Sequence, residues 1–235
     1  MRTAFFVDGY NLFYGLLADT PFKWLDLPGL LTHIVQIENP ASRLASVDYF
    51  TSSVKPRLAT RGRASKEAQD TYLRALKASQ VNVHLGRHQL EPAKAPRFIN
   101  KAVGASRQDT VDIWKLEEKE TDVHLAISMY RLAARQALHP PDERIEQLVL
   151  VSGDTDMAPA LRAIREDFPD LTLGVILPHR PQYQRPQPGS LKAQAHWMRR
   201  VVSAEELCKH QFPERVATRK APAIKPDYWL SLIHI

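Results

Sequence analysis

The spacing of apolar positions divides the chain into alternating strand-like and helix-like segments. Short apolar runs, typical of buried strands, lie at residues 4–7, 44–53, 81–86, 148–151 and 171–177, with a shorter edge strand at 197–202. Apolar residues recur every three or four positions at 11–14, 27–35, 66–79, 121–135 and 157–168. Strands separated by helices predict a parallel sheet covered on both faces. We therefore expect an α/β fold with three layers, α/β/α, around a mostly parallel central sheet.

The helix predicted at 121–135 has apolar residues on two stripes. One stripe holds Leu125, Met129 and Leu132, and the other holds Val123, Ile127, Tyr130 and Ala134. A helix that is apolar around most of its circumference is typical of a protein interior. We therefore expect this helix to be largely buried.

The alternation breaks down in an excursion at about residues 87–119. Segments 97–103 and 111–116 are predicted to form the two strands of a hairpin at one end of the sheet. Because the excursion leaves and rejoins the alternating pattern, it belongs to the main domain, to which we assign residues 1–210.

The C-terminal part, residues 211–235, is predicted to be a basic tail. From Pro213 onward it carries no clear period, and we expect it to be loose, anchored weakly if at all by Tyr228, Trp229 and Leu230. The chain has a net charge of +6, and the residues from His179 onward hold ten Lys/Arg against four Asp/Glu, which is the whole excess. Such a segment suits either attraction to a phosphate backbone or simple solubility, and the charge favours neither.

The remaining composition points to a cytoplasmic protein without a membrane partner. A lone cysteine, Cys208, excludes an intramolecular disulfide and a cysteine metal cluster. The N-terminus shows no signal-peptide pattern, and no apolar run approaches membrane-spanning length.

Four aspartates are predicted to meet at one edge of the sheet. Asp8 ends the first strand, and the central strand at 148–151 is followed by Asp154 and Asp156. Asp122 opens the helix before the central strand, and that helix must run antiparallel to the strand. Its first residue therefore lies at the carboxyl edge, where ligands bind in open α/β sheets. Asn11 can reach the same place from the first helix.

Each aspartate also has an ordinary structural role open to it. Asp8 with Gly9 is a common turn pair, and Asp122 or Asp156 can cap a helix. A cap at Asp156 would put Pro159 at the third helical position, which proline tolerates. Capping does not explain several carboxylates in one place, since they repel one another unless a cation neutralises them. Carboxylate ligands select Mg²⁺ or Mn²⁺, and such ions promote phosphodiester hydrolysis.

Three segments carry a family resemblance. Residues 6–12 (Phe-Val-Asp-Gly-Tyr-Asn-Leu), 117–126 and 151–159 (Val-Ser-Gly-Asp-Thr-Asp-Met-Ala-Pro) resemble, in order and spacing, the motifs of NYN domains, which are PIN-like ribonuclease domains. The resemblance covers roughly residues 3–202. It implies a PIN-like, Rossmannoid fold and Mg²⁺- or Mn²⁺-dependent cleavage of RNA that leaves a 5′-phosphate.

The resemblance also implies which residues act. The catalytic, metal-binding acids carry over to Asp8, Asp122, Asp154 and Asp156, with Asn11 as a polar companion. Glu118 and Lys119 match the second motif, and we expect at most an indirect role for them.

The substrate is expected to be single-stranded RNA. Asn11, Ser152 and Thr155 are predicted to contact it near the acids, and Arg57, Arg61 and Arg87 to attract its phosphates, assisted by Arg63, Lys101 and the basic C-terminal segment. Tyr10 and Tyr14 are candidates for stacking on unpaired bases, whereas core packing is favoured for Trp114.

Three other functions are weighed against the ribonuclease. A non-catalytic RNA-binding module would gain nothing from four carboxylates. A haloacid dehalogenase-type phosphatase needs Asp-x-Asp after the first strand, but Asp8 is followed by Gly9 and Tyr10. Some bacterial proteins similar to this family are labelled 6-hydroxy-3-succinoylpyridine 3-monooxygenase, yet this chain has no Gly-x-Gly-x-x-Gly dinucleotide motif. The number of metals and a possible homodimer stay open.

Overall fold

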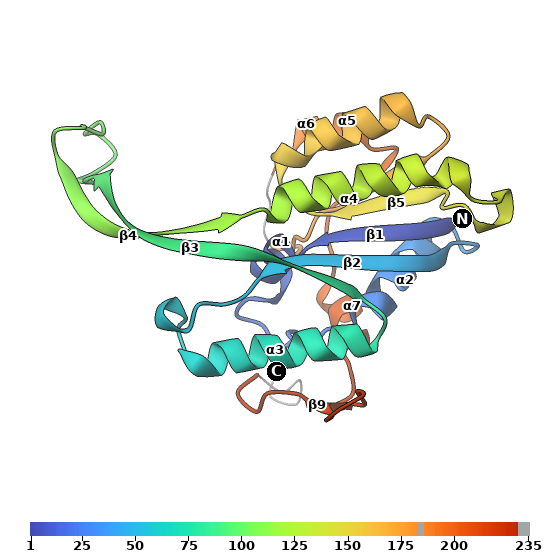
Figure 1. Cartoon of the computed structure of the whole chain (residues 1–235), viewed down its shortest axis with the longest axis horizontal. Coiled ribbons are helices and arrows are strands. Elements are labelled where there is room, and N and C mark those ends of the chain that lie inside the picture. The colour runs from blue at the N-terminus through green and yellow to red at the C-terminus, as the bar shows by residue number, and fades with distance from the viewer. Residues whose placement is uncertain (183–185, 230–235) are drawn as a thin grey trace.

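A seven-stranded sheet forms the centre of the molecule, with strand order β4-β3-β2-β1-β5-β6-β7 (Figure 1). The computed structural model describes residues 1–182 and 186–229. All neighbouring strands are parallel except β3 and β4, which are antiparallel. The strands are β1 (Arg2–Asp8), β2 (Arg43–Ser52), β3 (Asn82–Pro96), β4 (Thr110–Lys119), β5 (Gln147–Val151), β6 (Thr172–Ile176) and β7 (Trp197–Arg199).

Helices cover both faces of the sheet, with α4, α5 and α6 on one side and α2, α3 and α7 on the other (Figure 1). The α-helices are α1 (Gly9–Leu12), α2 (Leu27–Glu38), α3 (Arg63–Ala78), α4 (Thr121–Arg135), α5 (Ala158–Asp167), α6 (Gly189–Gln194) and α7 (Ala204–Lys209). A π-helical turn, η1 (Phe13–Leu17), extends α1, and short 3-10 turns are η2 (Pro56–Leu58), η3 (Gln136–Leu138), η4 (Pro141–Glu143) and η5 (Thr155–Met157). The expected three-layer α/β/α fold is thus confirmed.

The core has two halves because successive strand residues face opposite sides of the sheet. Phe5 and Val7 of β1 pack on the side of α2 and α3, whereas Ala4 and Phe6 pack on the side of α4 and α5. The central strands are buried on both faces and are therefore mainly apolar, as in β5, where only the first residue, Gln147, is polar. This double burial makes the positions of their ends rigid.

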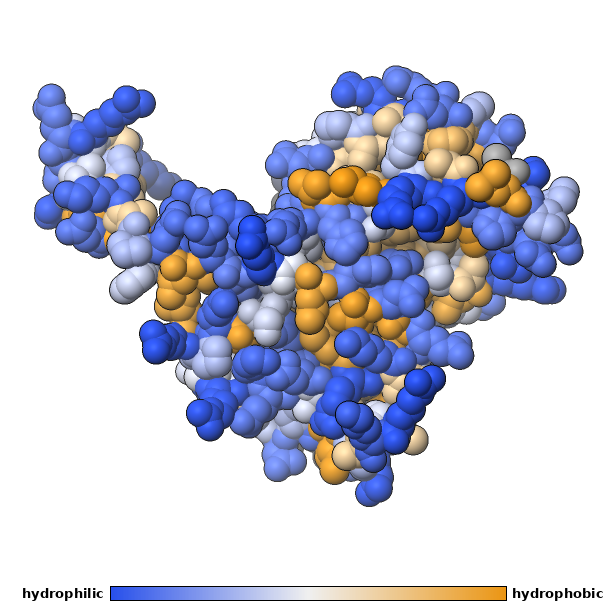
Figure 2. All heavy atoms as spheres, viewed as in Figure 1, coloured by the Kyte–Doolittle hydropathy of each residue, from blue (hydrophilic) through white to orange (hydrophobic). Residues whose placement is uncertain are grey.

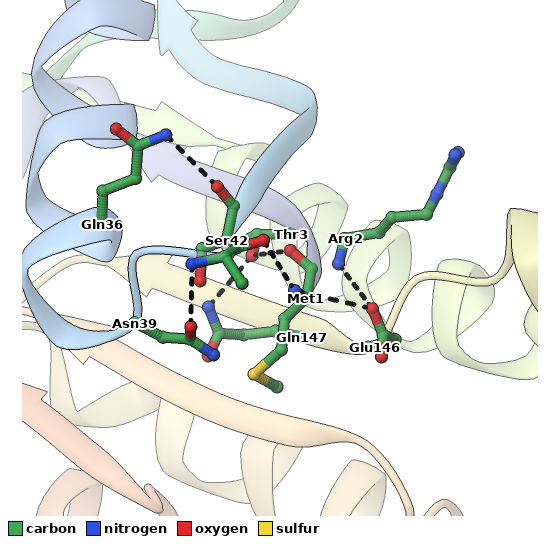
Figure 3. Close-up of polar contacts among 9 residues, drawn as sticks. Met1, Arg2, Thr3, Gln36, Asn39, Ser42, Glu146 and Gln147 are labelled. Carbon is green, nitrogen blue, oxygen red and sulfur yellow. Dashed lines mark hydrogen bonds and ion pairs between the residues drawn. The ribbon is translucent and has the colours of Figure 1, made fainter.

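The amino ends of the central strands are tied together by polar contacts (Figure 3). Gln147 Nε2 donates to Thr3 Oγ1 at 3.0 Å, and the backbone N–H of Arg2 donates to Glu146 Oε2 at 2.7 Å. These bonds fix the register of β1 against β5, and so they also fix which residues emerge at the opposite, carboxyl edge.

The excursion is a long two-stranded arm that projects from the body (Figure 1). The strand predicted at 81–86 continues to Pro96, and its partner is β4 at Thr110–Lys119. The strand predicted at 97–103 is therefore wrong, because these residues lie in the connection at the tip. The prediction of a hairpin holds, and its second strand contains the predicted segment 111–116.

The described part of the C-terminal segment is packed on the domain, and the prediction of a loose tail is wrong for it. Trp229 is 9% exposed, with its ring centroid 5.9 Å from that of Trp24 and 6.1 Å from that of Tyr72. Strands β8 (Arg215–Val216) and β9 (Ala223–Ile224) form a small hairpin, and Ala223 is fully buried. Leu230 lies outside the described residues.

Helix α4 has the predicted bounds but is only half buried. Leu125 and Met129 face the sheet, whereas Val123 and Ile127 are 64% and 50% exposed. The expectation of a largely buried helix is therefore wrong, because α4 lies on the outer surface and no described element covers its second stripe. Within the residues described, we find no helix with the length and apolarity needed to cross a bilayer.

The packing of Trp229 predicts that Trp229→Ala lowers the free energy of unfolding by about 3 kcal/mol, since truncating a buried tryptophan leaves a cavity. Urea denaturation measures this change. Trp114→Ala is the matched control, because Trp114 is 66% exposed, and its change should stay within about 0.5 kcal/mol. Equal unfolding midpoints for wild type and Trp229→Ala would contradict the packed position of the C-terminal segment.

Candidate active site

The site begins at Asp8, the last residue of β1. Asp8 is 5% exposed and caps α1, where its Oδ1 accepts from the backbone N–H of Asn11 at 2.9 Å. Its Oδ2 accepts from Asn11 Nδ2 at 2.7 Å and from Ser152 Oγ at 3.1 Å. The carboxylate is therefore held rigidly in one orientation at the carboxyl edge.

The loop after β5 supplies the second acid. The side chain of Asp154 accepts from the backbone N–H of Asp156 at 3.0 Å, so Asp154 caps the turn η5. The expectation that Asp156 caps the following helix is wrong, because α5 begins later, at Ala158, with Pro159 in its first turn. Asp156 is exposed, and Asp154 is intermediate in exposure.

Asn11 and Ser152 join the two strand ends. Asn11 Oδ1 accepts from the backbone N–H of Gly153 at 3.2 Å, while its amide donates to Asp8. Ser152, fully buried, donates to Asp8 and accepts from the backbone N–H of Asp154 at 3.0 Å. Because β1 and β5 are adjacent and the sheet continues away from them in opposite directions, this junction is the topological switch point, where open α/β sheets bind ligands.

A third group of residues faces this junction from the start of α4. Asp122 lies in the first turn of α4. Glu118 Oε1 accepts from Ser52 Oγ at 2.8 Å and from Thr121 Oγ1 at 2.6 Å. Gly86 lies beneath them, and a Cβ there would clash with Thr121 Oγ1 and the Lys119 carbonyl. A glycine is thus required for β2, β4 and α4 to meet.

The charges of the predicted acids influence one another. Although Asp122 is an exposed residue, partial desolvation raises the pKa of its carboxyl to about 6, and the charges of Asp8, Asp154, Glu118 and Asp156 add to the rise. Burial also raises the pKa of Asp8, against the lowering effect of its bonds from Asn11 and Ser152. The carboxylates therefore repel one another at this edge.

The carboxylate oxygens of these acids suit a divalent cation that keeps several of its water ligands. The described residues contain no group of three or more Asp, Glu, His or Cys side chains arranged to hold one ion. A preassembled site in which three aspartates bind one ion directly is therefore not present in the described parts of the chain. Mg²⁺ is commonly held by one or two carboxylates and several waters, and repelling carboxylates at one edge suit that mode.

The predicted substrate-binding residues are placed unequally. Thr155 is exposed beside the acids, whereas Ser152 is buried and committed to Asp8 and Asp154, so it can position but not bind. Arg57 is exposed in the turn that follows β2, at the same edge. Arg61 lies 4.7 Å from the ring centre of Tyr228, and Arg87 pairs with Glu120 at 2.9 Å.

Aromatic side chains line the approach to the acids. Tyr10 and Tyr14 are stacked, with ring centroids 6.0 Å apart, and Tyr14 is 67% exposed. The hydroxyl of Tyr10 lies 3.1 Å from His88 Nε2 on β3. Trp114 is exposed on the arm, so the core-packing role that we favoured for it is wrong.

Two further residues lie next to the site. Glu118, for which the sequence predicts at most an indirect role, carries a charge that helps to raise the pKa values of both Asp8 and Asp122. His179 was not singled out, but a Cβ on Gly153 would lie 3.5 Å from its Nε2. Its position directly after β6, at the same edge as Asp154, is the signal that could have found it.

A hollow at the opposite edge plays no part in this arrangement. It is lined by Met1, Arg43, Asp142 and Glu146 among others, at the amino ends of the strands. The candidate site is instead identified by its converging side chains.

Two known proteins are similar to this chain over most of its length. The chain is 32% identical over 247 aligned positions to 6-hydroxy-3-succinoylpyridine 3-monooxygenase HspA of Pseudomonas putida, an alignment that covers 97% of this chain and 75% of that protein. A crystal structure of a Vibrio parahaemolyticus protein of unknown function is similar with a TM-score of 0.49 and 14% identity, covering 90% of this chain and 96% of that one.

A family model provides the broader assignment. The model of the NYN domain matches residues 2–182, which span β1 through β6 and include all four aspartates. NYN domains are PIN-like and generally nuclease-like, and nucleases of this kind typically use divalent metals and bind RNA. The order of the three acidic segments along the chain agrees with the match, and the chain belongs to the NYN domain family.

Proposed function

We propose that this protein is a metal-dependent ribonuclease that hydrolyses phosphodiester bonds in single-stranded RNA. One observation supports this most strongly: the pKa of Asp122, at the switch point of the sheet, is raised by partial desolvation and raised further by the charges of Asp8, Asp154, Glu118 and Asp156. On a surface that only binds a polyanion, these negative charges would weaken the binding. With a cation between the carboxylates and a phosphate, the same charges hold the cation that promotes hydrolysis.

Each chain residue has a defined task in this proposal. Asp8 and Asp154 would hold Mg²⁺ or Mn²⁺ directly or through water, and Asp122 and Asp156 would complete its water shell or orient the attacking water. Asn11 and Ser152 act as positioning residues, because they bond to Asp8 and to the backbone after β5. The ion, when bound, would supply a water of lowered pKa and stabilise charge on the phosphate.

Substrate contacts follow from what is exposed around the acids. Arg57 and Arg87 would attract phosphates, and Tyr14 offers a ring face for an unpaired base. Thr155 would bond to phosphate or to an outer water. Single strands are favoured because their bases can reach such rings.

A monooxygenase is the second candidate, because the relative from Pseudomonas putida carries that name. The reaction would need a redox cofactor, and the sequence has no Gly-x-Gly-x-x-Gly motif for a dinucleotide. Flavin absorbance or oxidation of NADH by the purified protein would support this candidate over the ribonuclease. Binding of RNA without cleavage would favour a regulatory module instead.

Asp154→Asn should abolish RNA cleavage almost completely. It keeps an oxygen to accept from the Asp156 N–H but loses the charge that binds a cation, and the loss should exceed the about 100-fold typical of outer-shell changes. Gel analysis of a labelled RNA with Mn²⁺, with and without chelator, measures the rate. Asp170→Asn, an exposed change in the turn before β6, is the control and should cleave normally. Equal rates for wild type and Asp154→Asn would refute the proposal.

Divalent metal should stabilise the wild-type fold independently of any RNA. At about 100 times its Kd, an ion adds about 2.7 kcal/mol, or roughly 5 °C or more in Tm. The shift should shrink when the pH falls below about 6, since protons then compete for Asp122. Thermal melts with Mn²⁺ test this, and Asp154→Asn should show little shift. An undiminished shift in that variant would place the ion elsewhere.

Without metal, Asp122→Asn should make the protein more stable at neutral pH. The carboxyl has a pKa of about 6 in the folded state, against an ordinary value of 3.8, so the folded state binds the proton more tightly. Stability therefore falls as pH rises from 3.8 through about 6, and the amide removes that penalty. Urea unfolding in chelator should show a gain at neutral pH that shrinks toward acid. A variant less stable than wild type at neutral pH would argue against mutual repulsion.

A further inference from the structure

The β3–β4 arm begins at the rim of the candidate site. His88 and Glu118 face each other at its base, and both belong to the site described above. The ladder has ten residue pairs, from Arg87 and Lys119 to Pro96 and Thr110, a length of about 30 Å at the usual rise per residue. A two-stranded ribbon of this kind is only marginally stable by itself in water. We therefore expect the arm to bind a partner outside the body of the domain.

One face of the arm continues the surface of the site. Side chains alternate between the faces of a strand, so Leu90 and Pro92 share a face with His88, and their partners Leu116 and Trp114 share it with Glu118. Trp114 is 66% exposed and Leu116 is 43% exposed. An apolar track therefore leads outward from the aromatic approach formed by Tyr14, Tyr10 and His88.

Cations gather toward the tip. From residue 92 to residue 108 the arm has four basic residues and no acidic one: Lys94, Arg97, Lys101 and Arg107. Asp112 and Asp109 pair with the first two, at 4.0 Å and 3.1 Å. Within the described residues no ion pair involves Lys101 or Arg107, and Phe98, in the same connection at the tip, is 77% exposed. Figure 2 shows mainly hydrophilic residues at the end of the arm, with a few apolar ones among them.

We infer that the arm is an RNA-binding extension of the site: single-stranded RNA cut at the acids runs outward along this face, with a base stacked on Trp114 and phosphates on Lys101 and Arg107. The inference rests on the proposed function for the identity of the polyanion. Stacking on an indole is tolerant of sequence, and tip cations supply phosphate contacts, which is the combination that unspecific single-strand binders use.

A second copy of the chain is a less suitable occupant for the arm. The cores of protein interfaces are depleted of charged residues, yet the exposed Phe98 and Ile99 lie between Arg97 and Lys101. The track also starts among the site residues rather than at a separate patch. An arm that bound another copy would have no reason to continue the surface that leads to the acids.

Binding to labelled single-stranded RNA tests the inference, using the full chain in chelator so that no cleavage occurs. With an RNA of about 16 nucleotides, Trp114→Ala should weaken binding by about 10-fold, whereas Trp114→Phe, which keeps a ring, should retain most of the affinity. Changing Lys94, Arg97, Lys101 and Arg107 together to glutamine should flatten the dependence of log Kd on log salt by at least about 1.4, since the lost phosphate contacts of Lys101 and Arg107 contribute about 0.7 each.

The matched control removes four cations at the amino edge of the sheet. Arg43, Lys77, Arg131 and Arg135 are exposed there, and their joint change to glutamine should leave the salt dependence nearly as in wild type. An equal loss in the control would mean that only net charge matters, and it would overturn the inference. Unchanged affinity for long RNA in Trp114→Ala would overturn it as well.

Comparing RNA lengths separates the arm from the catalysis. Wild type should prefer the long RNA to one of about 4 nucleotides, and Trp114→Ala should lose that preference. If wild type binds RNA through the arm but cleaves none with Mn²⁺, the proposed catalysis fails and the arm inference stands. If RNA is cleaved with the same length preference in both proteins, the catalysis stands and the arm inference fails. If sedimentation shows that Trp114→Ala dissociates a wild-type dimer without changing RNA affinity, the occupant is a second copy and the inference is wrong.

Discussion

The hydrogen bonds that hold Asp8 decide the geometry of this site. Both oxygens of a buried carboxylate are bonded, one to the backbone of α1 and the other to Asn11 and Ser152. Burial alone would favour the neutral acid, and these three bonds oppose that tendency. Since Asn11 and Ser152 also bond to the loop after β5, the same few contacts set the distance between Asp8 and Asp154. Asp122 and Asp156 are then positioned relative to Asp8 and Asp154.

The central sheet was predictable because its signals are local and redundant. β1, β5 and β6 are buried on both faces and therefore appear in the sequence as short apolar runs. The acids were placed correctly at the carboxyl edge because parallel strands separated by helices leave no other choice. The bounds of α4, at Thr121–Arg135, follow from an uninterrupted helical period.

The features that could not be predicted from the sequence depend on whether segments far apart in the chain contact each other. The bonds of Glu118 to Ser52 and Thr121 exist only because β4 folds back along β3, and Ser52 is 66 positions away in sequence. The exposed stripe of α4 has the same residue types as a buried one, so periodicity cannot tell them apart. The packing of Trp229 on Trp24 could not be predicted, because an isolated tryptophan is not part of a periodic pattern of apolar residues. The cap at Asp154 rather than Asp156 depends on the tight turn η5, after which α5 starts at Ala158, one residue later than a cap at Asp156 would place it.

The connection between Ser152 and Asp8 has a consequence for when the protein is able to act. The two residues are 144 positions apart, and the strands that bear them are neighbours only in the finished sheet. During synthesis on a ribosome, β1 emerges early and waits without its partner until β5 has been made. A ribonuclease built in this way has no complete site while most of its chain is still being translated. For the proposed ribonuclease activity, this order of strands would protect the messenger RNA from the nascent product.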